Sequence, residues 1–115
     1  MKIEFSYRSK YTTVGRLLGD HSGTLLDVGA RDGVLRRCLP EALEYRSADV
    51  ASGCDVVVDL ERHLRFEDGS FDYVVALDVL EHVNNFHTAF HELLRIARRG
   101  VIIALPNMAF LPHRL

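Results

Sequence analysis

The chain is poor in cysteine and has no long apolar run, and both shortages narrow what it can be. Its 115 residues include only Cys38 and Cys54, which lack the CxxC spacing of a zinc or redox pair, so reduced structural thiols are expected. No apolar run approaches the length of a transmembrane helix. The first residues, MKIEFSYRSK, lack the apolar segment of a signal peptide. Together these shortages predict a cytoplasmic protein.

The chain also has little excess charge of either sign. It has 14 basic and 16 acidic residues, and its formal net charge of −2 predicts no strong attraction to nucleic acid or to a membrane. Hydrophobic residues make up 48% and charged residues 26%, which is ordinary for a globular domain. The length suits a single domain over residues 1–115, although residues 1–10 show no assignable pattern.

Short apolar runs alternate with helical segments along most of the chain. The runs are rich in valine, leucine and isoleucine, and this composition predicts buried strands at 24–28, 45–48, 55–58, 71–77 and 101–105. Helices are predicted at 11–18, 33–39 and 86–99. Gly100 is the expected residue just past the end of the last helix. The alternation is typical of a parallel sheet that helices cover on both faces.

A glycine turn follows the first predicted strand. The stretch LLDVGARDGVL, residues 25–35, passes through Gly29 and Gly33 into a helical pattern, where free backbone N–H groups can meet a ligand. Aligned on Gly29, the dinucleotide pattern G-x-G-x-x-G fails at Arg31 and Val34, and no P-loop pattern occurs. Nicotinamide, flavin and P-loop nucleotide sites are therefore disfavoured.

A carboxylate stands at the end of each of the next three strands. These residues are Asp49, Asp59 and Asp78, and each alone is more often a turn or capping residue than a ligand group. In a parallel sheet, however, ligands bind outside the carboxyl ends of the strands, so the three aspartates should converge there with the glycine turn. Asp49 lies 20 positions after Gly29, which suits hydrogen bonds to a ribose diol.

With these features in place, the chain resembles the class I S-adenosylmethionine-dependent methyltransferase domain, of the methyltransferase type 11 kind. The resemblance covers about residues 20–107, and its motifs are LLDVGARDG, RSADV, CDVVVDL, FDYVVALDVLEHV and LLRIARRGVIIALPN. It implies an α/β, Rossmann-like, doubly wound fold with a mostly parallel five-stranded sheet in the order 3-2-1-4-5 and helices on both faces. The tail, with Pro106-Asn107 and Arg114-Leu115, is also similar to the methionine-biosynthesis MetW branch.

The end of the sequence sets a further expectation. The chain stops soon after the fifth strand, so the usual C-terminal antiparallel hairpin should be lacking and the domain should be truncated. The fifth strand would then be an exposed apolar edge, which invites pairing with a second copy of the chain or with a partner protein.

The resemblance also implies a role for each motif residue. Gly29 and Gly33 would let the backbone approach the methionine part of the cofactor, Asp49 would hold the ribose hydroxyls, and Asp59 with Leu60 would meet the adenine. Asp27 would support the turn, and Leu77 with Asp78 would lie near the sulfonium. The implied cofactor-binding residues are Asp27, Gly29, Ala30, Arg31, Gly33, Asp49, Val50, Asp59, Leu60, Leu77 and Asp78.

Arg31 departs from the family motif, which has glycine at its position. Its side chain would either crowd the cofactor or pair with the methionine carboxylate, and the sequence leaves both outcomes open. His82 is the candidate general base for an oxygen nucleophile, with Glu81 beside it, although a structural role is the commoner one there. His87 and His91 have a metal-ligand spacing without an HExxH pattern, so a solvated helix face, and no metal, is expected.

The sequence therefore predicts methyl transfer from S-adenosylmethionine to a small-molecule acceptor, with neither nucleic acid nor membrane as a partner. The alternative is a shortened or degenerate cofactor-binding module that acts through a partner protein rather than by catalysis. A purely structural α/β domain would leave the clustered carboxylates unexplained.

Overall fold

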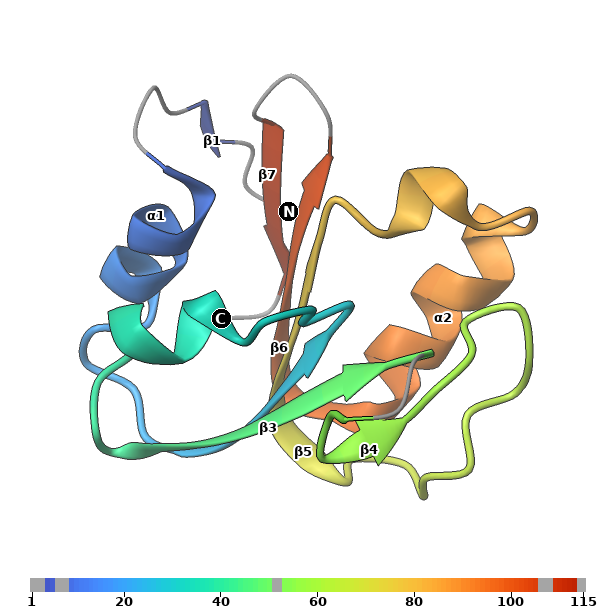
Figure 1. The fold of residues 1–115 in the computed structure, drawn as a ribbon, viewed down its shortest axis with the longest axis horizontal. Coiled ribbons are helices and arrows are strands. Elements are labelled where there is room, and N and C mark those ends of the chain that lie inside the picture. The colour runs from blue at the N-terminus through green and yellow to red at the C-terminus, as the bar shows by residue number, and fades with distance from the viewer. Residues whose placement is uncertain (1–3, 6–8, 51–52, 106–108, 114–115) are drawn as a thin grey trace.

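The computed structural model describes residues 4–5, 9–50, 53–105 and 109–113, which form one twisted sheet between helices (Figure 1). The strands are β1 (Glu4–Phe5), β2 (Gly23–Val28), β3 (Leu43–Asp49), β4 (Val56–Val57), β5 (Phe71–Leu77), β6 (Ala97–Leu105) and β7 (Ala109–His113). The helices are α1 (Lys10–Leu17) and α2 (Phe86–Ile96), with short 3-10 helices η1 (Val34–Cys38) and η2 (Leu80–His82). The Pro-Asn and Arg-Leu pairs of the MetW resemblance lie outside the described residues.

Five strands run parallel in the spatial order β4-β3-β2-β5-β6, which confirms the implied 3-2-1-4-5 order. β2 lies at the centre, and the chain adds β3 and β4 on one side of it before it crosses to β5 and β6 on the other. Such a switch point leaves a crevice at the carboxyl ends of the central strands. The glycine turn after β2 and the aspartates after β3 and β5 therefore reach the same edge of the sheet.

The expectation that the fifth strand is an exposed edge is wrong. β7 pairs with β6 in antiparallel register, from Val101 opposite His113 to Leu105 opposite Ala109, and β1 pairs antiparallel with β7. An unpaired apolar strand would leave a row of open backbone donors and acceptors, and β7 satisfies them. The residues after β6 thus supply an antiparallel strand that the sequence was not expected to contain, and the argument for a partner along that edge falls away.

α2 ends three residues earlier than its periodicity predicts. Ala97 has an extended backbone (φ −91°, ψ 126°) and pairs with Phe71, so β6 follows the helix directly. Gly100 therefore lies inside β6, opposite Tyr73, and not beyond a helix end. Pairing with β5 outweighs the local helical pattern here, because Ala97 and Gly100 both gain partners on β5, across a register shift between Phe71 and Tyr73. No helix in the described ranges is long and apolar enough to cross a membrane.

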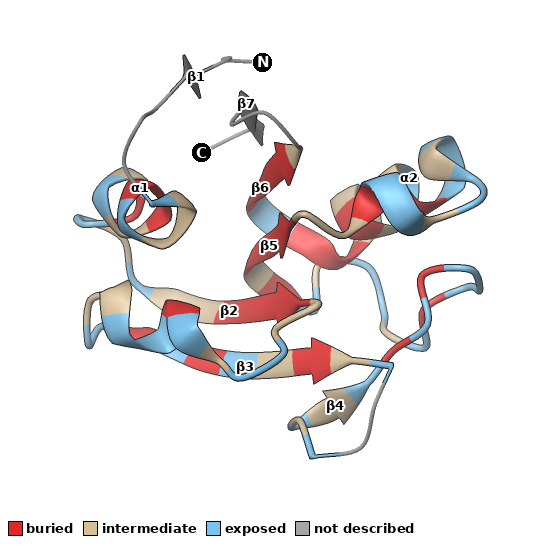
Figure 2. Ribbon diagram, turned by 45° about the horizontal axis from the view of Figure 1, so that its top comes forward, coloured by how far each residue is buried: buried red, intermediate tan, exposed pale blue. Residues whose placement is uncertain are grey.

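Two apolar cores lie on opposite faces of the sheet (Figure 2). Side chains alternate along a strand, so β2 places Leu25 in the core beneath α1 and η1 and Leu26 in the core beneath α2. The fully buried apolar side chains that the helices and their caps contribute are Val14, Leu18, Leu35, Leu80, Ala89, Leu93 and Ile96. β2, β5 and β6 are buried on both faces, which fixes the positions of the strand ends where the site forms.

Candidate functional site

Two adjoining cavities open at the carboxyl ends of the parallel strands. The main cavity, about 270 Å³, is lined by Val28, Gly29, Arg31, Asp49, Val50, Val58, Asp59, Leu60, Glu61, Asp78, Val79, His82 and Val83. The side cavity, about 230 Å³, is lined by Lys10, Tyr11, Asp27, Gly29, Ala30, Arg31, Leu77, Asp78, Glu81 and His82. Every predicted site residue except Gly33 lines at least one of them, so the predicted convergence of these residues is observed.

The glycine turn between β2 and η1 is held by its own backbone. The N–H groups of Gly29 and Ala30 donate to the Ala48 carbonyl at 2.7 and 3.2 Å, and the Gly33 N–H donates to the Ala30 carbonyl at 2.9 Å. Gly29 has φ +75°, and a Cβ there would overlap a methyl group of Val79. Gly33 has φ +71° and caps η1 outside both cavities. Glycine at position 29 is therefore required by packing, before any ligand is considered.

Arg31 holds a left-handed backbone conformation (φ +51°), which glycine adopts freely and which costs other residues about 1 kcal/mol. Its N–H donates to Asp49 Oδ2 at 3.1 Å, which fastens the turn to the end of β3. Its side chain is exposed and lines both cavities. Among the described residues, the guanidinium group forms no hydrogen bond or ion pair.

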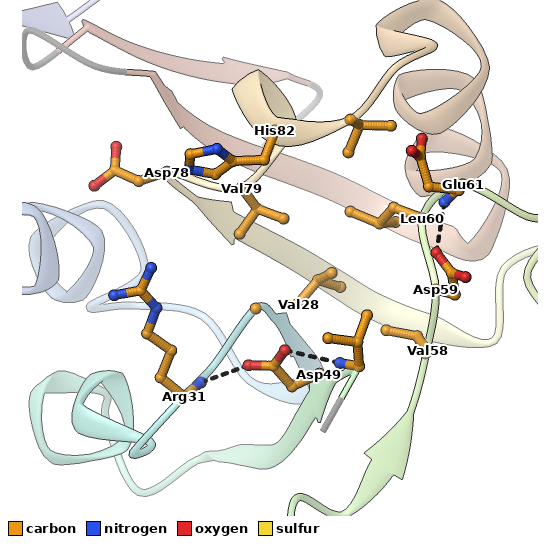
Figure 3. A pocket seen from close by; sticks show the side chains of 13 residues that line it. Val28, Arg31, Asp49, Val58, Asp59, Leu60, Glu61, Asp78, Val79 and His82 are labelled. Atoms are coloured by element: carbon orange, nitrogen blue, oxygen red, sulfur yellow. Dashed lines mark hydrogen bonds between the residues drawn. The ribbon is translucent and has the colours of Figure 1, made fainter. Parts of the chain in front are cut away.

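The Asp49 carboxylate is fixed by backbone donors on both oxygens. Oδ1 accepts from the Val50 N–H at 2.7 Å, and Oδ2 accepts from the Arg31 N–H (Figure 3). Each oxygen keeps a second lone pair, so two further hydrogen bonds remain available. The group lies between the Arg31 end of the main cavity and the end formed by Asp59 and Leu60. An oriented acceptor pair at this position suits a vicinal diol.

Asp59 and Leu60 form the other end of the main cavity. Asp59 Oδ1 accepts from the Glu61 N–H at 3.0 Å, and its Oδ2 lies 3.6 Å from Arg62 Nε, so this carboxylate also closes a turn. Glu61, which sequence reasoning missed, accepts from the backbone N–H of Asn84 at 2.9 Å and from its side-chain amide at 2.8 Å. Glu61 thereby joins the segment after β4 to the segment after η2 and closes that side of the cavity.

The side cavity contains an ion pair and a buried carboxyl group. Lys10 Nζ lies 2.6 Å from Asp78 Oδ2, and this bond raises the pKa of Lys10. Asp27 is only 3% exposed and accepts a hydrogen bond from Tyr45 Oη at 2.6 Å. Burial raises the pKa of Asp27 to about 6, although the bond from Tyr45 acts in the opposite direction. Asp27 thus supports the turn from beneath and is close to half-protonated at pH 6.

His82 lines both cavities, and its side chain is 74% exposed. Figure 3 shows it beside Val79 and Asp78 in the main cavity. Its Nε2 lies 3.6 Å from Glu81 Oε1, so the two neighbours form a candidate acid–base pair. His87 and His91 are exposed on α2, as predicted for a solvated face. In the part of the chain that the structure describes, no three histidine, cysteine or acidic side chains are grouped closely enough to hold a metal ion.

Some lining residues carried no signal in the sequence. Lys10 and Tyr11 come from the first turn of α1, and Lys10 meets a partner 68 positions away. Val28, Val58 and Val79 are each next to a predicted site residue in the sequence, and this adjacency could have placed them at the strand ends. Glu61 could not have been found, because its partner lies 23 positions further on in an irregular segment.

Comparison with known proteins gives a family match. The family model described as a methyltransferase domain matches residues 26–105. No curated protein sequence matches the chain. These results do not bear on the narrower MetW resemblance, which stays a prediction.

Solved structures share the fold at low sequence identity. A Bacillus halodurans C-125 protein assigned as a methyltransferase superposes with a TM-score of 0.70 at 16% identity, over 84% of this chain and 50% of that one. An S-adenosylmethionine-dependent methyltransferase from Aquifex aeolicus gives 0.60 at 20% identity, over 84% and 62%. The [4+2]-cyclase SpnF gives 0.62 at 23% identity, over 82% and 44%. The chain therefore spans roughly half the length of the structures it matches.

Proposed function

Because this chain belongs to the methyltransferase-domain family, we propose that it binds S-adenosylmethionine and transfers the methyl group to a small-molecule acceptor. The observation that carries the proposal is the Asp49 carboxylate, which two backbone N–H groups orient between the two ends of the main cavity. The two lone pairs that it keeps would accept hydrogen bonds from a ribose diol. The two ends of the main cavity have different linings, Arg31 at one and Asp59 with Leu60 at the other, and this difference would set the direction in which an adenosyl group lies.

The other lining residues fit the rest of such a ligand. Val58 and Leu60 offer apolar surface for an adenine ring, and Asp59 offers a carboxylate oxygen for its amino group. Gly29 and Arg31 line the opposite end, where the amino-acid part would lie. The lining therefore suits a nucleoside joined to an amino acid, which is the make-up of S-adenosylmethionine.

In the proposed reaction, the acceptor atom forms a bond to the methyl carbon as the carbon–sulfur bond breaks, and S-adenosylhomocysteine leaves. The bound cofactor supplies the reactive methyl group, so the chain contributes mainly orientation and exclusion of water. His82 lies where an acceptor would approach, and it would take the proton from an oxygen nucleophile.

A second candidate is a cofactor-binding module that acts through a partner protein. The likeness to SpnF, which is a cyclase by name, supports keeping it, because one fold can carry different chemistry. The two candidates share the cofactor site and differ only in turnover. For location we propose the cytoplasm, which suits two cysteines that form no disulfide.

The test begins with calorimetric titration of S-adenosylhomocysteine into the purified chain. We expect binding by the wild type and a loss of about tenfold or more in D49A, since a charge-assisted pair of hydrogen bonds is removed. D55A is the matched control, because Asp55 also accepts a backbone N–H near the end of β3 but lines neither cavity. No binding by the wild type would refute the proposal, and equal affinity in D49A would refute the role of Asp49.

Turnover then separates the two candidates. The wild type is incubated with methyl-labelled S-adenosylmethionine and a panel of small acceptors bearing oxygen, nitrogen or carbon nucleophiles. Labelled product would support methyl transfer. Tight cofactor binding without transfer to any class would favour the binding module.

A further inference from the structure

The main cavity has a direction, which Figure 3 makes visible. Arg31 and Asp78 lie at one end, Asp59 and Leu60 lie at the other, and Asp49 lies between them. If the ribose of an adenosyl ligand binds Asp49 and its base lies at the Leu60 end, its 5′ substituent points toward Arg31. The side cavity opens at that same end, because both cavities share Gly29 and Arg31.

Most charged groups around the side cavity already have partners. Lys10 is paired with Asp78 at 2.6 Å, and Asp27 accepts the hydroxyl of Tyr45 at 2.6 Å. Glu81 lies 3.6 Å from His82. Among the described residues that line the side cavity, only Arg31 carries a permanent charge without a hydrogen bond or an ion pair. An anionic group at this end of the side cavity could therefore form an ion pair with the guanidinium of Arg31.

The backbone at Arg31 adds a second observation. An arginine here holds φ +51°, although glycine would hold the same conformation without strain. Its main-chain N–H needs no side chain to reach Asp49, so the turn itself does not explain the arginine. Arg31 lies two positions after Gly29, and both residues line the end of the cavities where the amino-acid part of the ligand would lie. Guanidinium and carboxylate groups match in shape and can form two parallel hydrogen bonds.

From these observations we propose that Arg31 is a specificity-determining residue, which pairs with the carboxylate of the amino-acid end and makes the site prefer adenosyl ligands that carry one. The inference rests on the proposed function, because it needs an adenosyl ligand in the main cavity. It also decides between the two outcomes that the sequence left open: the side chain pairs with the cofactor and does not crowd it.

The test compares two ligands that differ only in the carboxylate: S-adenosylhomocysteine and its decarboxylated amine analogue. The wild type should bind the first about tenfold or more tightly than the second, as expected for one charge-assisted pair. R31A and R31G should reduce the preference to about twofold or less by weakening only the carboxylate-bearing ligand. R31K should keep part of the preference, because it keeps the charge but not the fork of donors.

R31G separates ligand recognition from any support of the fold. Glycine accepts φ +51°, so this variant should unfold at the same denaturant concentration as the wild type, or at a slightly higher one, while it loses the preference. R37A is the matched control, since Arg37 is an exposed arginine of η1 that lines neither cavity, and it should behave as the wild type.

Each other outcome overturns a definite part of the argument. Tighter binding of both ligands by R31A would mean that Arg31 crowds the site, and equal weakening of both would mean that it acts without regard to the carboxylate. If the wild type binds both ligands equally, the inference fails and the proposed function stands. If the wild type binds neither, the proposed function fails as well.

Discussion

Two segments that border the main cavity are held in different ways. Residues 29–33, of which Gly29 and Arg31 line the cavity, hold their shape mainly through backbone hydrogen bonds, whereas residues 59–68, of which Asp59, Leu60 and Glu61 line it, depend on side chains from elsewhere. In the first, which we call the turn wall, three backbone N–H groups bond to carbonyls and three residues take positive φ. In the second, the loop wall, residues of α2 and the segment before it fasten an irregular stretch to the body of the protein.

The fastening of the loop wall centres on two residues of α2. Glu92 Oε1 accepts the Leu64 N–H at 2.8 Å, and Arg95 donates to the carbonyls of Leu64 at 2.9 Å and Phe66 at 2.6 Å. Arg95 Nε also donates to Glu92 Oε2 at 2.7 Å, and this bond lowers the pKa of Glu92. The stability of the loop wall should therefore depend on charge and on salt concentration. The stability of the turn wall should instead depend on whether a Cβ is added to it.

The largest expected effect comes from an added Cβ in the turn wall. In G29A the new atom would overlap Val79 in a backbone conformation that alanine resists, so the free energy of unfolding should fall by about 3–4 kcal/mol. G33A is the control, because it meets only the conformational penalty, with Tyr45 Oη at 3.6 Å, and should lose about 1 kcal/mol. Urea unfolding measures both, and equal losses would mean that packing against Val79 does not hold this wall.

The second prediction tests whether a side chain also stabilises the turn wall, because buried Asp27 lies beneath it. Its folded pKa of about 6 is above the ordinary value of 3.8, so the folded state keeps a proton that the unfolded chain releases. Stability should therefore decrease as pH rises from 4 to 6, by about 3 kcal/mol in all. Glu92 has a lowered pKa and makes stability rise with pH, so it acts in the opposite direction. Glu92 is present in both wild type and D27N, so the difference between their unfolding free energies isolates the contribution of Asp27.

Y45F sharpens the same experiment. Removing the hydroxyl that stabilises the ionised Asp27 should move the midpoint of the stability change to higher pH. A wild-type profile that D27N leaves unaltered would show that this carboxyl group does not influence the turn wall.

The contrast between the walls also explains what the sequence could predict. The glycines of the turn wall follow a recognised motif, and Asp49 stands at the end of the next predicted strand, so spacing was enough to predict that Gly29, Gly33 and Asp49 converge, although Arg31 and Asp49 are 18 positions apart. The clamp on the loop wall joins residues 27 to 31 positions apart, and Arg95 gave only the pattern of a helix. Local sequence patterns cannot show that Arg95, which is at a helix position, donates to the backbone carbonyls of a distant irregular segment.

The fold divides in the same way. Alternating apolar runs predicted a parallel sheet, and the family resemblance implied its strand order. β7, in contrast, depends on the open backbone groups of β6, which exist only once the sheet has formed. The end of α2 was predicted three residues too late for a related reason. The residues before Ala97 have a helical pattern, but in the folded protein Ala97 pairs with Phe71 of β5.

The smallest expected effect lies in the loop wall and tests the comparison directly. E92A removes the acceptor of the Leu64 N–H and leaves Arg95 with only the exposed carboxylate of Asp68, so the free energy of unfolding should fall by about 1–2 kcal/mol. H91A, an exposed change on the same helix, is the control. Raising the salt concentration should weaken the wild-type clamp and narrow the gap to E92A, but leave the gap between wild type and G29A unchanged, because steric overlap is not screened. Hydrogen exchange at the Leu64 amide should accelerate in E92A before global unfolding does. If exchange there stays slow, the backbone of the loop wall holds itself, and the two walls differ less than their contacts indicate.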